Sequence, residues 1–272
     1  MDAEELKQRI DSFQSWNYRF ELPGGLATPV ASAWRVRRAE QRRRYFFEPL
    51  LGLTGGTLRG RRVLDLGCNA GFWSLEAIDA GADFVLGVDG SRTAIEQAEL
   101  VFEARGVERE RYAFQAANIF DRDAFERFDV VLCLGLLDVV AKPLALFELI
   151  ASAQPALVVI DTGISRARGA MFELARLGEP RNAVERDLVL VPTRRAVTEL
   201  AARFGFQAVA LAPDFPGDEL GVEDYLASRR LAFVCARGVA LDALAPAGEP
   251  PRNPWAGVLA AGLARARRKV GA

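Results

Sequence analysis

An aspartate and two glycines give this sequence its clearest chemical signal. Asp65 stands two positions before Gly67, and Gly71 follows four residues later, within RVLDLGCNAGFWSLEA. Glycines let the backbone turn tightly and approach a ligand closely, but this spacing is not the G-x-G-x-x-G that holds a pyrophosphate. An acidic residue beside the turn would repel a phosphate and attract an ammonium group. The pattern favours a ligand that carries positive charge and no phosphate, such as S-adenosylmethionine.

A second aspartate, Asp89, ends the next apolar run, in VLGVDGS. A carboxylate at this position can accept hydrogen bonds from both ribose hydroxyls of an adenosine. Gly90 and Ser91 would let the backbone pass close to that nucleoside. The alternative interpretation is that Asp89 only caps the following helix.

Apolar strands and helices alternate from Arg62 onward, which predicts a parallel sheet with helices on both faces. We expect an α/β fold with a Rossmann-like, doubly wound sheet of seven strands, mostly parallel with the last strand antiparallel. Ligands bind such a sheet at the carboxyl ends of its strands. The expected strands are residues 63–66, 84–89, 112–119, 129–135, 157–161, 207–211 and 231–236, and the expected helices include residues 92–105, 143–153 and 193–204.

An N-terminal strap or lid is expected to precede the sheet. Its aromatic segment, Trp16–Leu22, could cover the ligand or could serve as a hydrophobic strap, and the sequence supports both equally. Helices are expected on either side of it, at residues 2–15 and 30–51. The expected divisions of the chain are a strap at 1–55, a core domain at 56–238 with an irregular to helical rim insertion at 163–190, and a tail with a short helix at 239–272.

Composition excludes several classes of function. The 272 residues contain no histidine, which removes histidine-based catalysis, histidine-ligated metals and serine-type triads. Cys68, Cys133 and Cys235 lack metal-ligand spacing and are odd in number, which favours a reduced, cytoplasmic protein without a metal. The net charge of −1 and the pI of about 5.8 do not demand a nucleic acid or a membrane partner, and no apolar run approaches the length of a membrane span.

The motif from Asp65 to Gly71 resembles motif I of the class I S-adenosylmethionine-dependent methyltransferases. Within them, GCNAGF at 67–72 and FDVVLCLGLLD at 128–138 resemble the branch of the tRNA wobble-uridine carboxymethyltransferase, and the similarity runs from about Trp16 to Ala236. Leu137 and Asp138 replace the tyrosine and histidine of that branch, and Tyr18 stands where histidine is common. We therefore adopt the branch's fold and cofactor site, but neither its tRNA substrate nor its carboxylated cofactor.

The resemblance implies a role for each residue of the cofactor site. Asp65 would face the ammonium group, Asp89 the ribose, and Asn118 the adenine amine, although Asn118 could instead cap a turn. Ile119 would form an apolar wall, and Leu134 would lie below the sulfonium. The remaining positions expected to bring the backbone or side chain close to the cofactor are Gly67, Cys68, Asn69, Gly71, Gly90 and Ser91, with Asn69 at a position where many members have glycine.

Methyl transfer from a sulfonium is an in-line displacement that needs alignment of the reactants and exclusion of water. A hydroxyl acceptor also benefits from a base. Without histidine, the candidate bases are Asp138 and Asp161, which follow two of the predicted strands. Asp138 could instead cap the helix that begins at Pro143. The candidate substrate contacts are Trp16, Tyr18, Arg168, Tyr225 and Arg229, with Tyr225 and Arg229 on one face if that stretch is helical.

Three functions remain open at this point. The favoured one is a methyltransferase of biosynthetic metabolism that acts on a small-molecule acceptor, with O-methylation expected. An RNA methyltransferase is the second, because nine arginines and two glutamates lie between Arg35 and Arg62 and could follow a phosphate backbone. The third is a protein that binds S-adenosylmethionine without catalysis. The oligomeric state cannot be inferred from the sequence.

Overall fold

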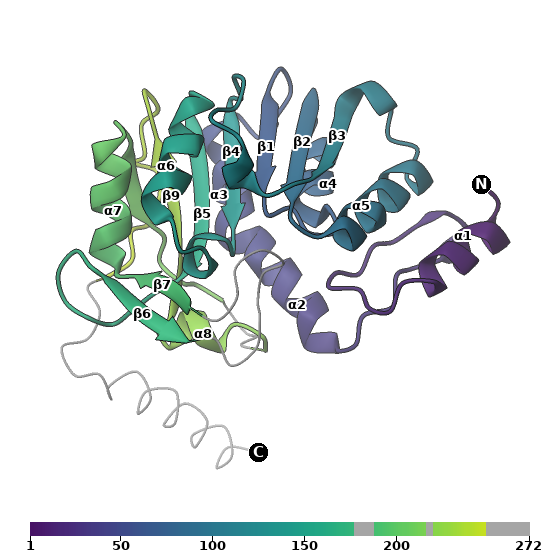
Figure 1. Cartoon of the computed structure of the whole chain (residues 1–272), viewed down its shortest axis with the longest axis horizontal. Coiled ribbons are helices and arrows are strands. Elements are labelled where there is room, and N and C mark those ends of the chain that lie inside the picture. The colour runs from purple at the N-terminus through teal and green to yellow at the C-terminus, as the bar shows by residue number, and fades with distance from the viewer. Residues whose placement is uncertain (177–187, 216–219, 249–272) are drawn as a thin grey trace, which may run out of the picture.

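Short runs of β-branched and apolar residues form the central sheet of the computed structural model, which describes residues 1–176, 188–215 and 220–248. The sheet has seven strands in the order β3-β2-β1-β4-β5-β9-β8 (Figure 1). The strands are β1 (Arg62–Leu66), β2 (Phe84–Asp89), β3 (Tyr112–Ala116), β4 (Val130–Leu134), β5 (Leu157–Gly163), β8 (Gln207–Ala210) and β9 (Arg230–Ala236).

The direction of the strands brings the polar ends of β1, β2 and β4 to one edge. β1 pairs in parallel with both β2 and β4, so the order of the strands reverses beside β1. Such a switch point leaves a crevice at the carboxyl ends of the strands. β9 runs antiparallel to both of its neighbours, β5 and β8. The predicted fold class, mostly parallel with the last strand antiparallel, is therefore confirmed.

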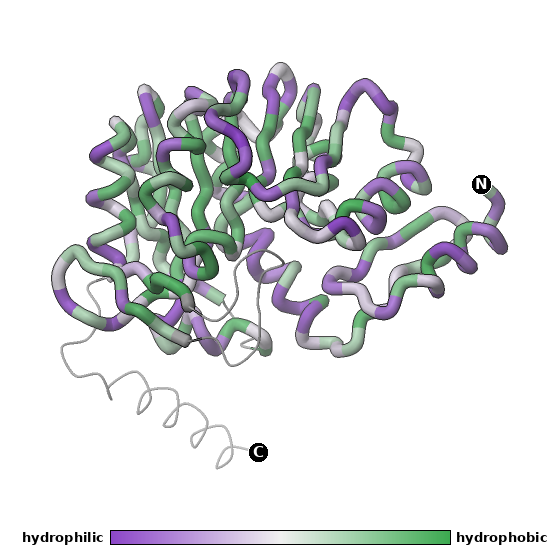
Figure 2. Tube along the Cα trace, in the orientation of Figure 1, coloured by the Kyte–Doolittle hydropathy of each residue, from purple (hydrophilic) through white to green (hydrophobic). Residues whose placement is uncertain are grey.

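Two hydrophobic layers cover the two faces of the sheet, because alternate residues of each strand point to opposite sides. Val63 and Val85 face a layer that includes the N-terminal helices, whereas Leu64 and Leu86 face the other layer. Figure 2 shows the hydrophobic strands between more polar helices. The helices are α1 (Ala3–Asp11), α2 (Ala33–Arg42), α3 (Glu48–Leu53), α4 (Phe72–Asp79), α5 (Arg92–Ala104), α6 (Pro143–Ser152), α7 (Arg194–Arg203) and α8 (Glu223–Leu226).

The stretch expected to be one helix at 30–51 contains a π-helical turn instead. α2 ends at Arg42, five residues of π-helix follow (η2, Arg43–Phe47), and α3 continues from Glu48. Tyr45, Phe46 and Phe47 are all buried. The π turn places these three consecutive rings in the core together.

The rim insertion is also different from the expectation. Its described parts are not helical: β6 (Phe172–Arg176) and β7 (Leu188–Pro192) form a separate antiparallel pair. Alternating, β-branched residues such as LVLVP favour a strand over a helix. Residues 177–187 of the insertion and residues 249–272 of the expected tail, including its helix, lie outside the described residues. Among the described residues, no helix has both the length and the apolar character that crossing a bilayer requires.

Candidate functional site

The turn after β1 is built from left-handed backbone conformations. Gly67 and Gly71 have φ angles of 73° and 76°, and Asn69 between them has a φ of 50°. A Cβ atom at Gly71 would lie 3.1 Å from the Ala98 Cβ, so this glycine also permits close packing of the turn against α5. Asparagine tolerates the left-handed region better than most residues. The Asn69 Oδ1 accepts a hydrogen bond of 3.2 Å from the side-chain Nδ2 of Asn17, which joins the turn to the N-terminal segment.

Asp89 lies at the end of β2 with both carboxylate oxygens held by backbone donors. Its Oδ1 accepts from the Ser91 amide at 2.8 Å, and its Oδ2 accepts from the Asn69 amide at 2.9 Å. The Ser91 side chain, rather than Asp89, caps α5 by accepting from the Ala94 amide. Asp89 is therefore not the N-cap of α5, in contrast to the alternative interpretation. A carboxylate has about four lone-pair sites, so Asp89 keeps acceptor capacity for a ligand.

The end of β3 differs from the sequence expectation. The strand stops at Ala116, not at residue 119, because Asn118 begins a 3₁₀ turn, Ile119–Asp121. The Asn118 Oδ1 accepts from the Phe120 amide at 3.1 Å, so the asparagine does cap a turn. Asn118 and Ile119 nevertheless both line the cavity described next, and the turn positions them there.

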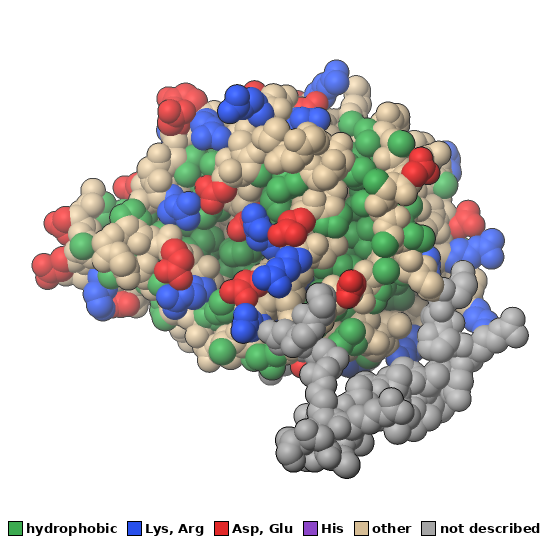
Figure 3. All heavy atoms as spheres, turned by 180° about the vertical axis from the view of Figure 1, so that it is seen from behind, with side chains coloured by type: hydrophobic (Ala, Val, Ile, Leu, Met, Phe, Trp, Pro, Cys, Tyr) green, Lys and Arg blue, Asp and Glu red, His purple; other side chains and the backbone are tan. Residues whose placement is uncertain are grey.

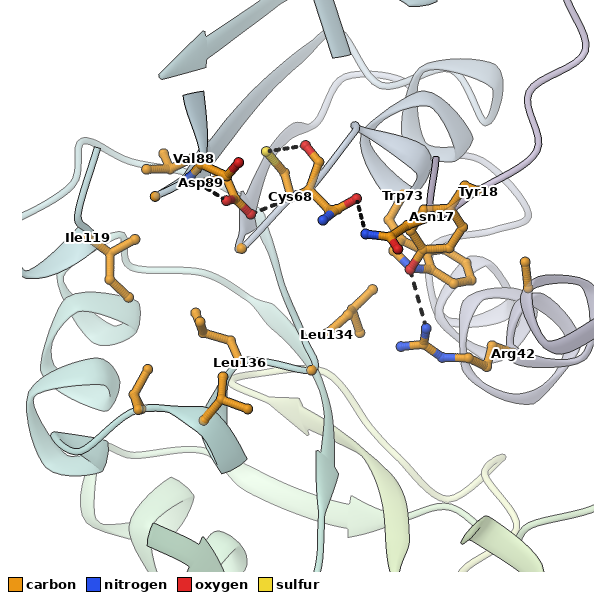
Figure 4. Close-up of a pocket in the computed structure, with 18 of the residues that line it drawn as sticks. Asn17, Tyr18, Arg42, Cys68, Trp73, Val88, Asp89, Ile119, Leu134 and Leu136 are labelled. Carbon is orange, nitrogen blue, oxygen red and sulfur yellow. Dashed lines mark hydrogen bonds between the residues drawn. The ribbon is translucent and has the colours of Figure 1, made fainter. Parts of the chain in front are cut away.

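A cavity of about 590 Å³ opens at this edge of the sheet and reaches the N-terminal helices. Its volume is typical of a small-molecule site. In Figure 4, Asp89 and Ile119 lie on one side of the cavity, Tyr18 and Arg42 lie on the other, and Leu134 lies between them. Burial raises the pKa of the Cys68 thiol well above its ordinary value, so this lining cysteine stays protonated. The predicted cofactor residues that line the cavity are Gly67, Cys68, Asn69, Asp89, Gly90, Ser91, Asn118, Ile119 and Leu134.

Asp65 does not line the cavity, in contrast to its predicted contact with an ammonium group. Its carboxylate is buried beneath α4 and accepts a hydrogen bond of 2.7 Å from the Ser74 hydroxyl. Burial raises the pKa of Asp65 to about 7, and the Ser74 hydrogen bond offsets part of that rise. Asp65 therefore supports the turn from below, through the first turns of α4.

The raised pKa of Asp65 predicts a pH-dependent effect of Asp65→Asn. Between pH 4 and 7 the native state holds a proton that the unfolded state has lost, so native stability falls as the pH rises through this range. Asparagine carries no such proton, and it can still accept from Ser74. Because the pKa of Asp65 is raised by roughly three units and each unit corresponds to 1.36 kcal/mol, we expect Asp65→Asn to raise the free energy of unfolding at pH 8 by on the order of 4 kcal/mol.

Urea denaturation without ligand from pH 3.5 to pH 8.5 measures this difference. The two proteins should converge near pH 3.5, where Asp65 is protonated in both states. Asp83→Asn is the control, because Asp83 is exposed. A difference between Asp65→Asn and wild type that stays constant over the whole pH range would contradict the buried, protonated carboxyl.

The N-terminal segment packs on the core and also reaches the cavity. Trp16 is only 2% exposed, belongs to the core, and donates its indole N–H to the Ile10 carbonyl. The neighbouring side chains of Asn17 and Tyr18 line the cavity. Tyr18 stacks on Phe72 of α4, with ring centroids 4.6 Å apart and an angle of 11° between the rings. Of the two proposed substrate contacts in this segment, the structure therefore places Tyr18 at the cavity and Trp16 in the core.

One face of α2 supplies cavity residues that the sequence analysis did not identify. Arg35, Arg38 and Arg42 follow the i, i+3, i+7 spacing of one helix face, and all three line the cavity. The spacing places the three arginines on one helix face but does not reveal that this face meets a cavity, so the sequence predicts only a possible phosphate-binding surface. The exposed Trp34 at the start of the helix and the buried Trp73 of α4 also line the cavity.

A buried network of charges holds Arg42 in place. The Arg42 Nη2 lies 2.6 Å from the Asp161 Oδ2, and the Arg230 Nε lies 3.1 Å from the same oxygen. The Tyr225 hydroxyl donates to the Asp161 Oδ1 at 2.9 Å. Burial alone would raise the pKa of Asp161, but Arg230 and Arg42 outweigh burial and hold that pKa below its ordinary value. The Arg42 Nη1 faces the Tyr18 hydroxyl at 3.5 Å, as Figure 4 shows.

The two predicted bases are members of this network and do not reach the cavity. Asp161 is completely buried among its partners, and Asp138, 6% exposed, accepts from the Thr162 hydroxyl at 3.2 Å and lies 3.4 Å from the Arg230 Nη1. Each carboxylate has one oxygen facing an arginine and the other accepting from a hydroxyl, and neither residue lines the cavity, so neither is placed to take a proton from a ligand there. The assignment of Asp138 and Asp161 as catalytic bases is therefore corrected.

Three of the predicted substrate contacts also lie away from the cavity. Tyr225 is buried against Asp161, and its pKa is raised by burial. α8 ends at Leu226, so Tyr225 and Arg229 do not share a helix face, and the Arg229 side chain is exposed. Arg168 is exposed in the segment before β6. Position along the chain could not place these residues: Tyr225 is held by its hydrogen bond to the buried Asp161, whereas Arg168 and Arg229 lie on the surface.

Comparisons with known proteins identify the family of this chain. A family model described as "Methyltransferase domain" matches residues 38–211, more than half of the chain. The ubiquinone biosynthesis O-methyltransferase of Coxiella burnetii is 32% identical over 143 residues, which cover 53% of each chain. The tRNA U34 carboxymethyltransferase of Citrifermentans bemidjiense is 26% identical over 223 residues, covering 77% of this chain and 61% of that protein. The chain thus spans about half the length of the first of these relatives.

A solved structure has the same arrangement of elements. The N-terminal domain of EvdMO1, crystallised in the presence of S-adenosylhomocysteine and D-fucose, superposes with a TM-score of 0.65 at 21% identity, covering 88% of this chain and 98% of that chain. At this identity the likeness shows the fold. Together with the family model and the cavity at the switch point, it shows that the chain belongs to the methyltransferase domain family, with the fold of the class I S-adenosylmethionine-dependent methyltransferases.

Proposed function

We propose that this protein transfers the methyl group of S-adenosylmethionine to a hydroxyl group of a small molecule. The observation that carries the proposal is the single cavity that joins the Asp89 end of the sheet to Tyr18 and Arg42. A cofactor and an acceptor can share such a cavity, which is the first requirement of a direct displacement. The O-methyltransferase relatives from ubiquinone biosynthesis support oxygen as the acceptor atom.

The residues present fit the cofactor. Asp89 retains acceptor capacity for ribose hydroxyls, and Asn118 and Ile119 provide a polar atom and an apolar wall for adenine. The left-handed turn from Gly67 to Gly71 brings the backbone close to the cavity. S-adenosylmethionine supplies an electrophilic methyl group on its sulfonium, so the protein has to hold the acceptor in line and exclude water.

Tyr18 is the side chain that we assign to the acceptor. Its ring is fixed by stacking on Phe72, and its hydroxyl faces Arg42, which Asp161 anchors. The phenol can exchange hydrogen bonds with an acceptor hydroxyl, and the fixed ring gives that contact a defined direction. The strap therefore closes the cavity and orients the acceptor with the same residue.

The substitution Tyr18→Phe tests this role. Phenylalanine keeps the stacking on Phe72 and removes only the hydroxyl, so binding of S-adenosylhomocysteine should change less than about threefold. The turnover number on an accepted hydroxyl substrate should fall by about 10²-fold, the lower range for a positioned acid–base group. Steady-state kinetics and calorimetry separate the two effects. Turnover equal to that of wild type would contradict the assignment of Tyr18.

The arginine-rich region argues for a small acceptor over RNA. Arg38 pairs with Asp224, Arg42 with Asp161, and Arg43 with Glu48 and Glu76. Arginines that are neutralised within the protein are poor partners for phosphates. Figure 3, which views the molecule from behind, shows acidic side chains interspersed with basic ones and no continuous basic surface on that side.

RNA remains the second candidate, because the tRNA U34 carboxymethyltransferase relative aligns over 77% of this chain. Incubation of the protein with methyl-labelled S-adenosylmethionine tests both functions in parallel. One set of reactions contains small catechols and phenols, and the other contains total tRNA at low salt. Label in a small product that is absent with Asp89→Ala supports our proposal. Label only in tRNA, lost steeply as salt rises, would replace the proposal with the RNA function.

A further inference from the structure

One arginine of the cavity has no carboxylate partner among the described residues. Arg38 is neutralised by Asp224, with both guanidinium nitrogens at 2.8 Å from its oxygens, and Arg42 is neutralised by Asp161. Arg35 lies on the same face of α2 and is half-buried, but its hydrogen bond goes to the neutral side chain of Asn17. Arg35 therefore brings an uncompensated positive charge to the cavity wall.

The neighbours of Arg35 hold its guanidinium in a defined position. Its Nη1 donates to the Asn17 Oδ1 at 2.5 Å, and the Asn17 amide in turn donates to the Asn69 Oδ1. Its Cζ lies 5.3 Å from the centre of the Trp34 ring. An arginine has five N–H donors, so most of the donors of Arg35 stay available. A held guanidinium with available donors is suited to bidentate recognition of a carboxylate.

The start of α2 adds to the positive potential at this position. The helix begins at Ala33, and the side chain of its N-cap residue, Ser32, makes no capping hydrogen bond. Uncompensated N–H groups at a helix start favour an anion. Among the described residues that line the cavity, Asp89 is the only carboxylate, and backbone donors hold both of its oxygens, so no carboxylate of the lining pairs with Arg35.

From these observations we infer that Arg35, Asn17 and the first turn of α2 form a carboxylate-binding subsite of the cavity. Trp34, 42% exposed, presents its ring beside this subsite and suits a flat ligand. The inference rests on the proposed function and makes it more specific, because an acceptor that fits is a planar hydroxyl compound bearing a carboxylate. The amino-acid portion of the cofactor carries the same chemical group, so the experiment has one arm for each source.

Calorimetric titration of the full chain separates the two sources. Wild type, Arg35→Met and Arg37→Met are each titrated with S-adenosylhomocysteine and with 5′-methylthioadenosine, which lacks the amino-acid portion. Each protein, saturated with S-adenosylhomocysteine, is then titrated with 3,4-dihydroxybenzoate and with its methyl ester. Arg37→Met is the matched control, because it removes an exposed arginine from the same helix at a position outside this cavity.

If the subsite binds the carboxylate of the acceptor, wild type should bind 3,4-dihydroxybenzoate at least about tenfold more tightly than its methyl ester, and Arg35→Met should lose this preference. If the subsite instead binds the carboxylate of the cofactor, Arg35→Met should weaken the binding of S-adenosylhomocysteine at least about tenfold and leave the binding of 5′-methylthioadenosine unchanged. In both cases Arg37→Met should behave as wild type.

The subsite is overturned if Arg35→Met binds each of these ligands as tightly as wild type does. The same conclusion holds if neither protein binds either benzoate compound and both bind S-adenosylhomocysteine equally. Wild-type binding of S-adenosylhomocysteine distinguishes this result from a failure of the proposed function. Intact binding leaves the methyltransferase proposal in place, whereas its absence in folded wild-type protein would overturn both. Arg35→Lys keeps the positive charge but loses the planar pair of N–H donors, so it should retain only part of the preference for a carboxylate-bearing ligand.

Discussion

Replacing Asp89 with alanine is expected to weaken the binding of S-adenosylhomocysteine by about 10²- to 10⁴-fold. In our account, the carboxylate accepts two charge-assisted hydrogen bonds from the ribose, each worth about 1.5–3 kcal/mol. The same carboxylate also holds the amides of Asn69 and Ser91, at 2.9 and 2.8 Å. Its loss therefore removes both the ligand contact and the support of the turn after β1. Calorimetric titration measures the change directly.

Asp123→Ala is the control for this substitution, because it removes an exposed carboxylate of the same net charge outside the cavity. It should bind the ligand as wild type does. Circular dichroism of both variants checks that each is folded before titration. A change of less than about threefold in a folded Asp89→Ala protein would mean that the ribose does not lie on Asp89.

Removing the carboxylate of Asp161 is expected to cost about 3–5 kcal/mol of unfolding free energy. In Asp161→Ala the guanidinium groups of Arg42 and Arg230 stay buried without the carboxylate that both contact. Tyr225 also loses the acceptor for its buried hydroxyl. An uncompensated buried charge costs more than the pair contributes, which is why the expected loss is large. Urea denaturation at pH 7 measures it.

Asp224→Ala provides the matched comparison, because it also breaks an aspartate–arginine pair, but one whose side chains are 20% and 32% exposed. We expect a loss of about 1 kcal/mol for this variant. A loss of that size for Asp161→Ala as well would contradict the description of Arg42 as an anchored, buried cation.

The pH dependence of Asp161→Ala follows from the sign of its pKa shift. The pKa of Asp161 is lowered in the native state by Arg230 and Arg42, against the effect of burial. Its stabilising contribution is therefore complete above the unfolded value of about 3.9 and is lost as the pH falls through the lower native value. The difference between wild type and Asp161→Ala should be constant from pH 5 to pH 8 and should shrink in stronger acid.

The sheet was predictable because its pattern is local. The run that ends at Asp89 was expected at residues 84–89 and is β2 without change, and the helix expected at residues 193–204 is α7, Arg194–Arg203, with Thr193 as its N-cap. Buried parallel strands give continuous apolar runs, and caps depend on neighbouring residues, so both can be read from short windows. The π turn at Arg43–Phe47 leaves no such local pattern, and its rings pack against residues distant in sequence, such as Trp73 and Phe215.

The cofactor half of the site was more predictable than the acceptor half. Asp89 and the turn from Gly67 to Gly71 follow from the positions of strand ends, which the sequence pattern reveals. Asp161 was expected at the cavity for the same reason, yet two arginines distant in sequence bury it in an ion-pair network. Such long-range pairing leaves no local pattern, so neither that network nor the cavity position of Arg42 could be inferred beforehand.

The crystal structure of the complex with S-adenosylhomocysteine is the most direct test of the account. We predict that in this complex both ribose hydroxyls lie within hydrogen-bonding distance of the Asp89 carboxylate, with adenine against Ile119 and the sulfur between Leu134 and Tyr18. A ligand bound with its ribose away from Asp89, or in the separate cavity between α3 and Phe215, would contradict the central claim that this edge of the sheet is the methyl-donor site.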